Sequence, residues 1–145
     1  MIISIFGKPG SGKTTLLKNI LSALHNDTHK AVHYWSPYLN DNPERDFKVE
    51  TNSIIGISEF HIFQLRYLSI EQLRYMFSGH RHLNIDFVID SQRPAMVSRD
   101  ITALSDHIIC FNITEKRDIE YLKFYSDKAL DLPNLQKYTY IDILQ

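Results

Sequence analysis

The sequence is short of cysteine, of long apolar runs and of net charge, and each shortage excludes a class of protein. Cys110 is the only cysteine in 145 residues, so a fold stapled by internal disulfides is excluded. It lies in the apolar run His-Ile-Ile-Cys-Phe and is expected to be a buried core thiol. No apolar stretch reaches the ~20 residues that a membrane helix needs, so we expect no membrane segment.

Charge is almost balanced, with 16 Lys and Arg against 17 Asp and Glu and a net charge of −1. A global basic field for nucleic acid is therefore excluded, and any contact with DNA or RNA must come from a local patch or from oligomerisation. The first strand is expected to begin at Met1 or Ile2, which leaves no room for a signal peptide. The expected location is a reducing cytoplasm, that of the infected host if the protein is viral.

The chain has the length of one domain, residues 1–145, in which apolar runs alternate with helical patterns. The apolar runs predict strands at 2–6, 31–35, 53–58, 87–90, 108–111 and 138–143. The helical patterns predict helices at 13–24, 70–77, 101–104 and 115–125. A polar connection at 36–52 is predicted to be irregular. Such alternation indicates an α/β fold with a mainly parallel sheet.

The segment from Gly7 to Thr14 matches the motif G-x-x-x-x-G-K-[ST] in full. Glycines let successive backbone N–H groups converge on phosphate oxygens, and a helix that begins there adds its positive dipole end. Lys13 is expected to reach the β- and γ-phosphates of ATP, and the Thr14 hydroxyl is expected to ligate Mg²⁺. The residues expected to bind ATP are Gly7, Pro9, Gly10, Ser11, Gly12, Lys13, Thr14 and Thr15. The motif follows a strand and opens a helix, which indicates a three-layer α/β/α P-loop NTPase fold.

An acid at the end of an apolar strand should accompany this loop, and two strands compete for that place. One ends in Ser58 and Glu59, so it has a glutamate but a serine where an aspartate is expected. The other ends in Asp90, but Ser91 and Gln92 follow instead of an acid. Glu59 suits the general base for an attacking water, and Gln92 suits a polar sensor that orients that water. A solvated carboxylate at 59, a loop amide at 92 and a structural acceptor at 90 remain open alternatives.

The order of these segments resembles the FtsK/HerA superfamily of P-loop motor ATPases, and most closely its small viral and phage members that package genomes or assemble filamentous phages. After the P-loop come the strand that ends at Glu59, Gly79-His80-Arg81-His82, Ser91-Gln92-Arg93-Pro94, and the apolar strand after Asp106. The stretch from Ser91 to Pro94 matches the Thr-Gln-Arg-Pro-like end of the family's sensor strand. The resemblance covers residues 1–125.

This resemblance implies a role for each matching residue. Glu59 would be the catalytic glutamate and Gln92 the polar sensor. Arg81 would act across a subunit boundary on a neighbour's γ-phosphate. Arg93 and Arg99 are further candidates for that last role, and the sequence does not rank the three.

The chain departs from the family pattern at the metal site. Ser58 stands where the family has a metal-organising aspartate, and Asp90 stands where the family has an apolar or neutral residue. We expect Asp90 to take part of the missing acid's place near Mg²⁺. Strand alternation puts Asp90 on the same face as Gln92 but ~6–7 Å further down the strand, which is deep for a metal ligand.

Three functions fit these residues. The leading one is a homo-oligomeric ATPase, a ring such as a hexamer, that uses ATP and Mg²⁺ to move DNA or assemble a virion, with DNA and capsid or assembly proteins as partners. The second is a small nucleoside or nucleotide kinase with an arginine-rich lid, for which only the region of Arg93 and Arg99 is a candidate. The third is a nucleotide-binding assembly module that has lost hydrolysis because of Ser58.

Overall fold

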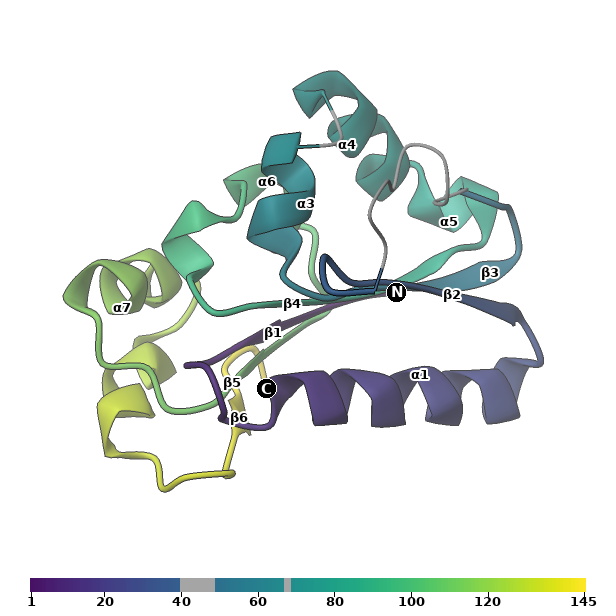
Figure 1. The fold of residues 1–145 in the computed structure, drawn as a ribbon. Helices are drawn as coiled ribbons and strands as arrows, with labels where there is room; N and C mark the ends of the chain where they lie inside the picture. Colours follow the sequence, from purple (N-terminus) through teal and green to yellow (C-terminus); the bar gives the residue numbers. More distant parts are fainter. Residues whose placement is uncertain (40–48, 67–68) are drawn as a thin grey trace.

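A six-stranded sheet in the order β2-β3-β4-β1-β5-β6 forms the centre of the computed structural model, which describes residues 1–39, 49–66 and 69–145 (Figure 1). Its strands are β1 (Ile2–Phe6), β2 (Ala31–Trp35), β3 (Ser53–Ile57), β4 (Asp86–Ser91), β5 (His107–Cys110) and β6 (Ile141–Asp142). All neighbouring pairs are parallel except β5 with β6. The predicted α/β fold with a mainly parallel sheet is confirmed.

Helices cover both faces of this sheet, which gives the predicted three layers. The α-helices are α1 (Lys13–Thr28), α3 (Phe60–Arg66), α4 (Ile70–Ser78), α5 (His80–Leu83), α6 (Arg99–Thr102) and α7 (Lys116–Lys123), and the 3₁₀ helices are η1 (Pro94–Met96) and η2 (Asp127–Asn134). Helix α1 runs along one face, whereas α3, α4 and α5 lie over the other (Figure 1). No helix in the described residues has the length and apolar content needed to cross a membrane.

Two apolar layers hold these helices to the sheet, because successive strand residues point to opposite faces. On the α1 side, Leu17 and Leu21 pack with Ile3, Ile5 and other residues of β1, β3 and β4. A Cβ built on Gly56 would lie 2.6 Å from Leu21 Cδ1, so α1 can approach β3 this closely only because residue 56 has no side chain. The opposite layer is larger and contains a cluster of four phenylalanines, namely Phe60, Phe63, Phe77 and Phe87.

The differences from the predicted elements are local. Helix α1 extends four residues beyond the predicted 24, to Thr28. The last strand was predicted at 138–143 but comprises only Ile141–Asp142, because Tyr138 has a positive φ of 66° that no strand accommodates. Helix α3, the short α5 and both 3₁₀ helices were not predicted. Part of the predicted irregular connection, 40–48, lies outside the described residues.

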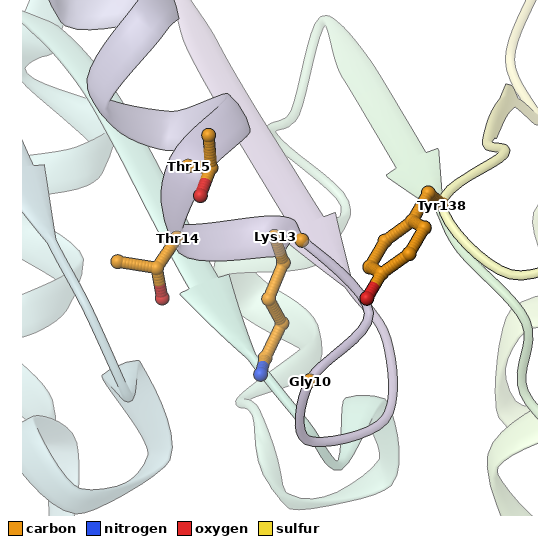
Figure 2. A pocket seen from close by; sticks show the side chains of 6 residues that line it. Gly10, Lys13, Thr14, Thr15 and Tyr138 are labelled. Carbon is orange, nitrogen blue, oxygen red and sulfur yellow. The ribbon is translucent and has the colours of Figure 1, made fainter.

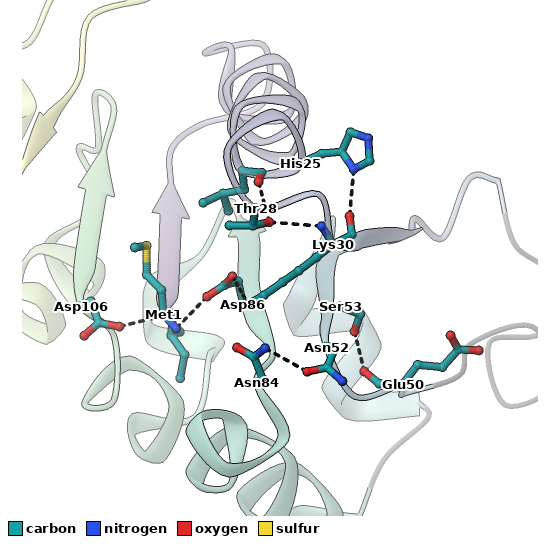
Figure 3. Close-up of polar contacts among 12 residues, drawn as sticks. Met1, His25, Thr28, Lys30, Glu50, Asn52, Ser53, Asn84, Asp86 and Asp106 are labelled. Atoms are coloured by element: carbon teal, nitrogen blue, oxygen red, sulfur yellow. Dashed lines mark hydrogen bonds and ion pairs between the residues drawn. The ribbon is translucent and has the colours of Figure 1, made fainter.

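Asp86, at the start of β4, joins three parts of the chain (Figure 3). Its carboxylate accepts hydrogen bonds of 2.9 Å from Lys30 Nζ and from the amino group of Met1. The side chain of Asp86 is only 14% exposed. Burial alone would raise the pKa of Asp86, but the bonds and charges of Lys30 and the Met1 amino group outweigh burial and hold this pKa below its usual range.

We predict that Asp86→Asn lowers the free energy of unfolding at pH 7 by about 1–2 kcal/mol, since a partly buried charged acceptor is lost. A carboxylate with a depressed folded-state pKa stabilises the fold above its unfolded pKa of about 3.9, and this contribution disappears as the pH falls through the lower folded-state value. The difference between the wild type and the variant should therefore shrink below about pH 4. Urea unfolding at several pH values measures it.

Asp100→Asn is the matched control, because Asp100 pairs with Arg74 at 2.7 Å but both side chains are about half exposed or more. Exposed pairs contribute about 0–1 kcal/mol. Equal losses in the two variants would contradict the role given to Asp86.

Candidate active site

The P-loop connects the end of β1 to the start of α1, so its backbone N–H groups meet the positive end of a 16-residue helix. Gly12 caps that helix with φ 100°, a conformation that favours glycine. A Cβ built on Gly7 would lie 2.6 Å from Ser11 Oγ and 2.9 Å from Phe111 Cβ, so position 7 has no room for a side chain. A pocket of about 300 Å³ opens on the loop and is lined by Gly10, Gly12, Lys13, Thr14, Thr15 and Tyr138 (Figure 2).

The side chain of Asp90 connects this loop to the next two strands. Strand β4 lies between β1 and β3, and Asp90 pairs in register with Ile5 of β1. The fully buried Asp90 carboxylate accepts hydrogen bonds from Thr14 Oγ1 at 3.3 Å, from Ser58 Oγ at 3.0 Å and from the Glu59 backbone N–H at 3.0 Å. Although Asp90 lies deep in the strand, its carboxylate contacts Thr14, the second residue of α1.

Opposing effects act on the protonation of Asp90. Burial raises the pKa of Asp90, whereas the bonds from Glu59 N and Ser58 and the charge of Lys13 lower it; the net effect is a raised pKa. The Thr14 hydroxyl and the Asp90 carboxylate are hard oxygen ligands beside the phosphate loop. Magnesium prefers such donors, so these two side chains fit a Mg²⁺ ion beside the phosphates.

Glu59 lies next to Lys13 in a strained backbone conformation. Its φ is 53°, which is uncommon outside glycine and is concentrated at functional sites. Glu59 Oε1 is 3.8 Å from Lys13 Nζ, and both side chains are buried. Glu59 Oε2 is buried and makes no hydrogen bond to any residue that the structure describes. A buried carboxylate oxygen that receives no hydrogen bond can accept one from a water or from a substrate.

His61 is a site residue to which sequence reasoning gave no role. Its Nδ1 lies 2.9 Å from Ser91 Oγ and 3.6 Å from Glu59 Oε2, so it connects the ends of β3 and β4. Burial lowers the pKa of His61, the Glu59 charge opposes this, and the charges of Lys13 and Arg93 add to the lowering. Its proximity to Glu59 in sequence was the available signal, but the contact with Ser91 depends on β4 lying beside β3.

Gln92 and the three candidate arginines are the remaining predicted residues. Gln92 directly follows β4 and is half-buried. Arg81 is on α5 and is 80% exposed. Because α5 precedes β4, Arg81 lies at the amino ends of the parallel strands, whereas the P-loop lies at their carboxyl ends. Arg93 Nε is held by the buried Asp118 at 2.8 Å, and Arg99 lies over the ring of Tyr121 at 4.4 Å. Both arginines therefore bind residues of α7.

A phosphate loop between a central parallel strand and a helix, with an acid on the adjacent strand, defines a P-loop NTPase fold. Comparisons with known proteins agree. The family model for the viral superfamily 1 RNA helicase core domain matches residues 3–63, less than half of the chain. No curated protein matches the sequence.

Solved structures match the whole fold at low sequence identity. The genome packaging NTPase B204 of Sulfolobus turreted icosahedral virus 2, in complex with sulfate, aligns with a TM-score of 0.77 and 14% identity over 98% of this chain and 90% of that chain. The DNA-packaging ATPase B204 of Sulfolobus turreted icosahedral virus aligns at 0.77 and 17%, over 98% and 92%. The RuvB Holliday junction branch migration motor of Thermotoga maritima aligns at 0.54 and 21%, over 83% and 41%. The protein thus resembles viral P-loop ATPases in its fold.

Proposed function

We propose that this protein is an ATP-hydrolysing motor subunit of the FtsK/HerA type that acts in viral DNA packaging or virion assembly. One observation carries the hydrolytic part of the proposal: the buried Asp90 carboxylate lies against Thr14 and Ser58, where an acid is needed. The packaging part is supported by the likeness to two viral packaging NTPases over nearly the whole of this chain and of theirs.

Each site residue has a separate role in the proposed reaction. The P-loop N–H groups and Lys13 bind the phosphates, and Lys13 can leave Glu59, from which it is separated by 3.8 Å, for the γ-phosphate. Glu59 accepts a proton from a water that attacks the γ-phosphorus in line, while the bond to the β–γ bridging oxygen breaks and ADP leaves. Gln92, at the end of β4, orients that water. Mg²⁺ held by Thr14 and Asp90 would neutralise charge on the β- and γ-phosphates.

The two other functions have less support. A kinase needs cationic side chains over the transferred phosphate, but Arg93 binds Asp118 and Arg99 stacks on Tyr121. A non-hydrolysing module was suggested by the serine at 58, but Ser58 donates its hydroxyl to an acid on the neighbouring strand.

The first prediction tests turnover. We expect Mg²⁺-dependent phosphate release from ATP that DNA stimulates. Glu59→Gln should lower this release by about 10²–10⁴-fold and retain ATP binding, because only the proton acceptor is lost. Lys13→Ala should lose binding as well. Phosphate release and calorimetry measure both quantities. Tight ATP binding by a wild type that releases no phosphate would favour the assembly module, and phosphoryl transfer to a nucleoside would favour the kinase.

The second prediction tests whether Asp90, on β4, takes the role of the aspartate that the family pattern has at position 58. Asp90→Asn should lower turnover by about 10–100-fold, a typical loss when a group that organises a metal is neutralised. The double exchange Ser58→Asp with Asp90→Ser keeps one carboxylate and one hydroxyl in the same place and should recover most of the activity. Ser58→Asp alone buries two carboxylates and is the matched control. Unchanged turnover in Asp90→Asn, with a normal Mg²⁺ requirement, would refute this role.

The third prediction concerns Arg81, which can reach a nucleotide only on a neighbouring subunit. Arg81→Ala and Lys13→Ala proteins should each be inactive, and a mixture should regain part of the activity, because some interfaces then join an intact pocket to an intact arginine. A mixture of Lys13→Ala with Glu59→Gln should stay inactive, since every pocket keeps one defect. Phosphate release from assembled mixtures measures this. No recovery in the first mixture would exclude Arg81 from this role.

A further inference from the structure

The proposed catalytic residues all lie on one side of the P-loop. Thr14, Glu59 and Asp90 lie where the P-loop meets β4 and β3, so the reacting end of a triphosphate belongs on that side. The opposite side of the P-loop faces β5 and the segment 136–140, which leads into β6. A nucleotide whose γ-phosphate lies beside Glu59 must therefore direct its ribose and base elsewhere, and the pocket on the loop continues towards this second side.

Tyr138 forms the wall of the pocket on that side (Figure 2). Its ring stands against the phosphate loop, since a Cβ built on Gly12 would lie 3.6 Å from Tyr138 Cδ1. The ring also borders a second pocket of about 280 Å³ on the other side of the loop, next to Lys8, Pro9 and Asn112. Even so, Tyr138 is 64% exposed.

The backbone at Tyr138 is held in an unfavourable conformation by its surroundings. A φ of 66° is a genuine outlier for a bulky residue. The Asn112 side-chain amide donates to the carbonyls of Leu132, Pro133 and Leu135, and so ties the segment before Tyr138 to the end of β5. Strain that the surroundings enforce is typical of ligand clamps.

The residues after Tyr138 are fixed as well. The Thr139 backbone N–H donates to Gln136 O at 3.1 Å and closes a turn around the tyrosine. The Tyr140 ring packs on Phe111 with 5.2 Å between centroids. The Tyr138 ring is therefore presented to solvent by a segment that is anchored on both sides, and this exposure is not the result of a loose chain end.

We propose that the Tyr138 ring is the stacking wall of a nucleobase subsite, so that a nucleoside triphosphate binds with its phosphates in the P-loop and its base against Tyr138. This inference rests on the proposed binding of a nucleoside triphosphate. Lys137 Nζ lies over the ring at 4.9 Å from its centroid, so a cation covers one face and the base is assigned to the other. A ring that stacks does not read hydrogen bonds, so the subsite accepts ATP and GTP with similar affinity.

The experiment compares ATP with a ligand that has a triphosphate chain but no nucleoside. Calorimetry in Mg²⁺ measures binding of ATP and of inorganic tripolyphosphate to the full chain. We expect Tyr138→Ala to weaken ATP binding roughly tenfold, a typical loss for one base–aromatic stack, and to leave tripolyphosphate binding unchanged. Tyr138→Phe, which keeps the ring, should bind ATP like the wild type. Tyr75→Ala, at another tyrosine that is 72% exposed, is the control for loss of a surface ring.

Each other outcome overturns the inference in a distinct way. Equal weakening of ATP and tripolyphosphate by Tyr138→Ala would mean that the ring shapes the phosphate loop and not a base subsite. Unchanged ATP affinity in Tyr138→Ala would mean that the base lies elsewhere, with the proposed function intact. A wild type that binds neither ligand would refute the proposed function together with the subsite. Unfolding curves of Tyr138→Ala and Tyr138→Phe verify that both variants fold.

Discussion

The site depends on one buried acid. Asp90 has no exposed surface, and a carboxylate in such a place is costly unless donors surround it. Its donors come from two parts of the chain, namely Thr14 near the start of α1, and Ser58 with the backbone of Glu59 in the turn that follows β3. A hydrogen bond to a charged group contributes about 1.5–3 kcal/mol, so satisfying this carboxylate also fixes the P-loop helix against the ends of two strands.

The strained residue Glu59 lies at this point. The chain leaves β3 and turns directly into α3 at Glu59, whose backbone N–H donates to Asp90 and whose φ is 53°. The same turn puts the Glu59 side chain between Lys13 and His61, in an environment that supplies its Oε2 with no hydrogen bond from the described residues. The same turn therefore positions both a donor to Asp90 and the proposed base, Glu59.

Most of the fold followed from periodicity and from a single motif, because both act over short distances along the chain. Five of the six predicted strands match β1 to β5, the P-loop segment connects a strand to a helix as predicted, and the ends of β3 and β4 were named as the candidate acid-bearing positions. What could not be predicted depends on which distant segments meet. Tyr138 lies far along the chain from the P-loop, and the β5–β6 pairing, the Asn112 contacts and the packing of Tyr140 on Phe111 bring it there. The predicted strand at 138–143 failed for the same reason, since tertiary contacts enforce a positive φ that local propensity opposes.

The geometry of parallel sheets explains how an acid on β4 and a serine after β3 can share one site. Neighbouring parallel strands lie about 4.8 Å apart, and their carboxyl ends lie at the same end of the sheet. Side chains at the ends of β3 and β4 can therefore reach the same space next to Thr14. A carboxylate on β4 points to that volume if its residue faces α1, and the Ile5–Asp90 register places Asp90 there. A side chain at the end of β3 that faces this carboxylate should be a donor, since a second carboxylate would repel the first. Ser58 meets this requirement with a hydroxyl 3.0 Å from Asp90, so the serine and the aspartate form one compensated pair across two strands.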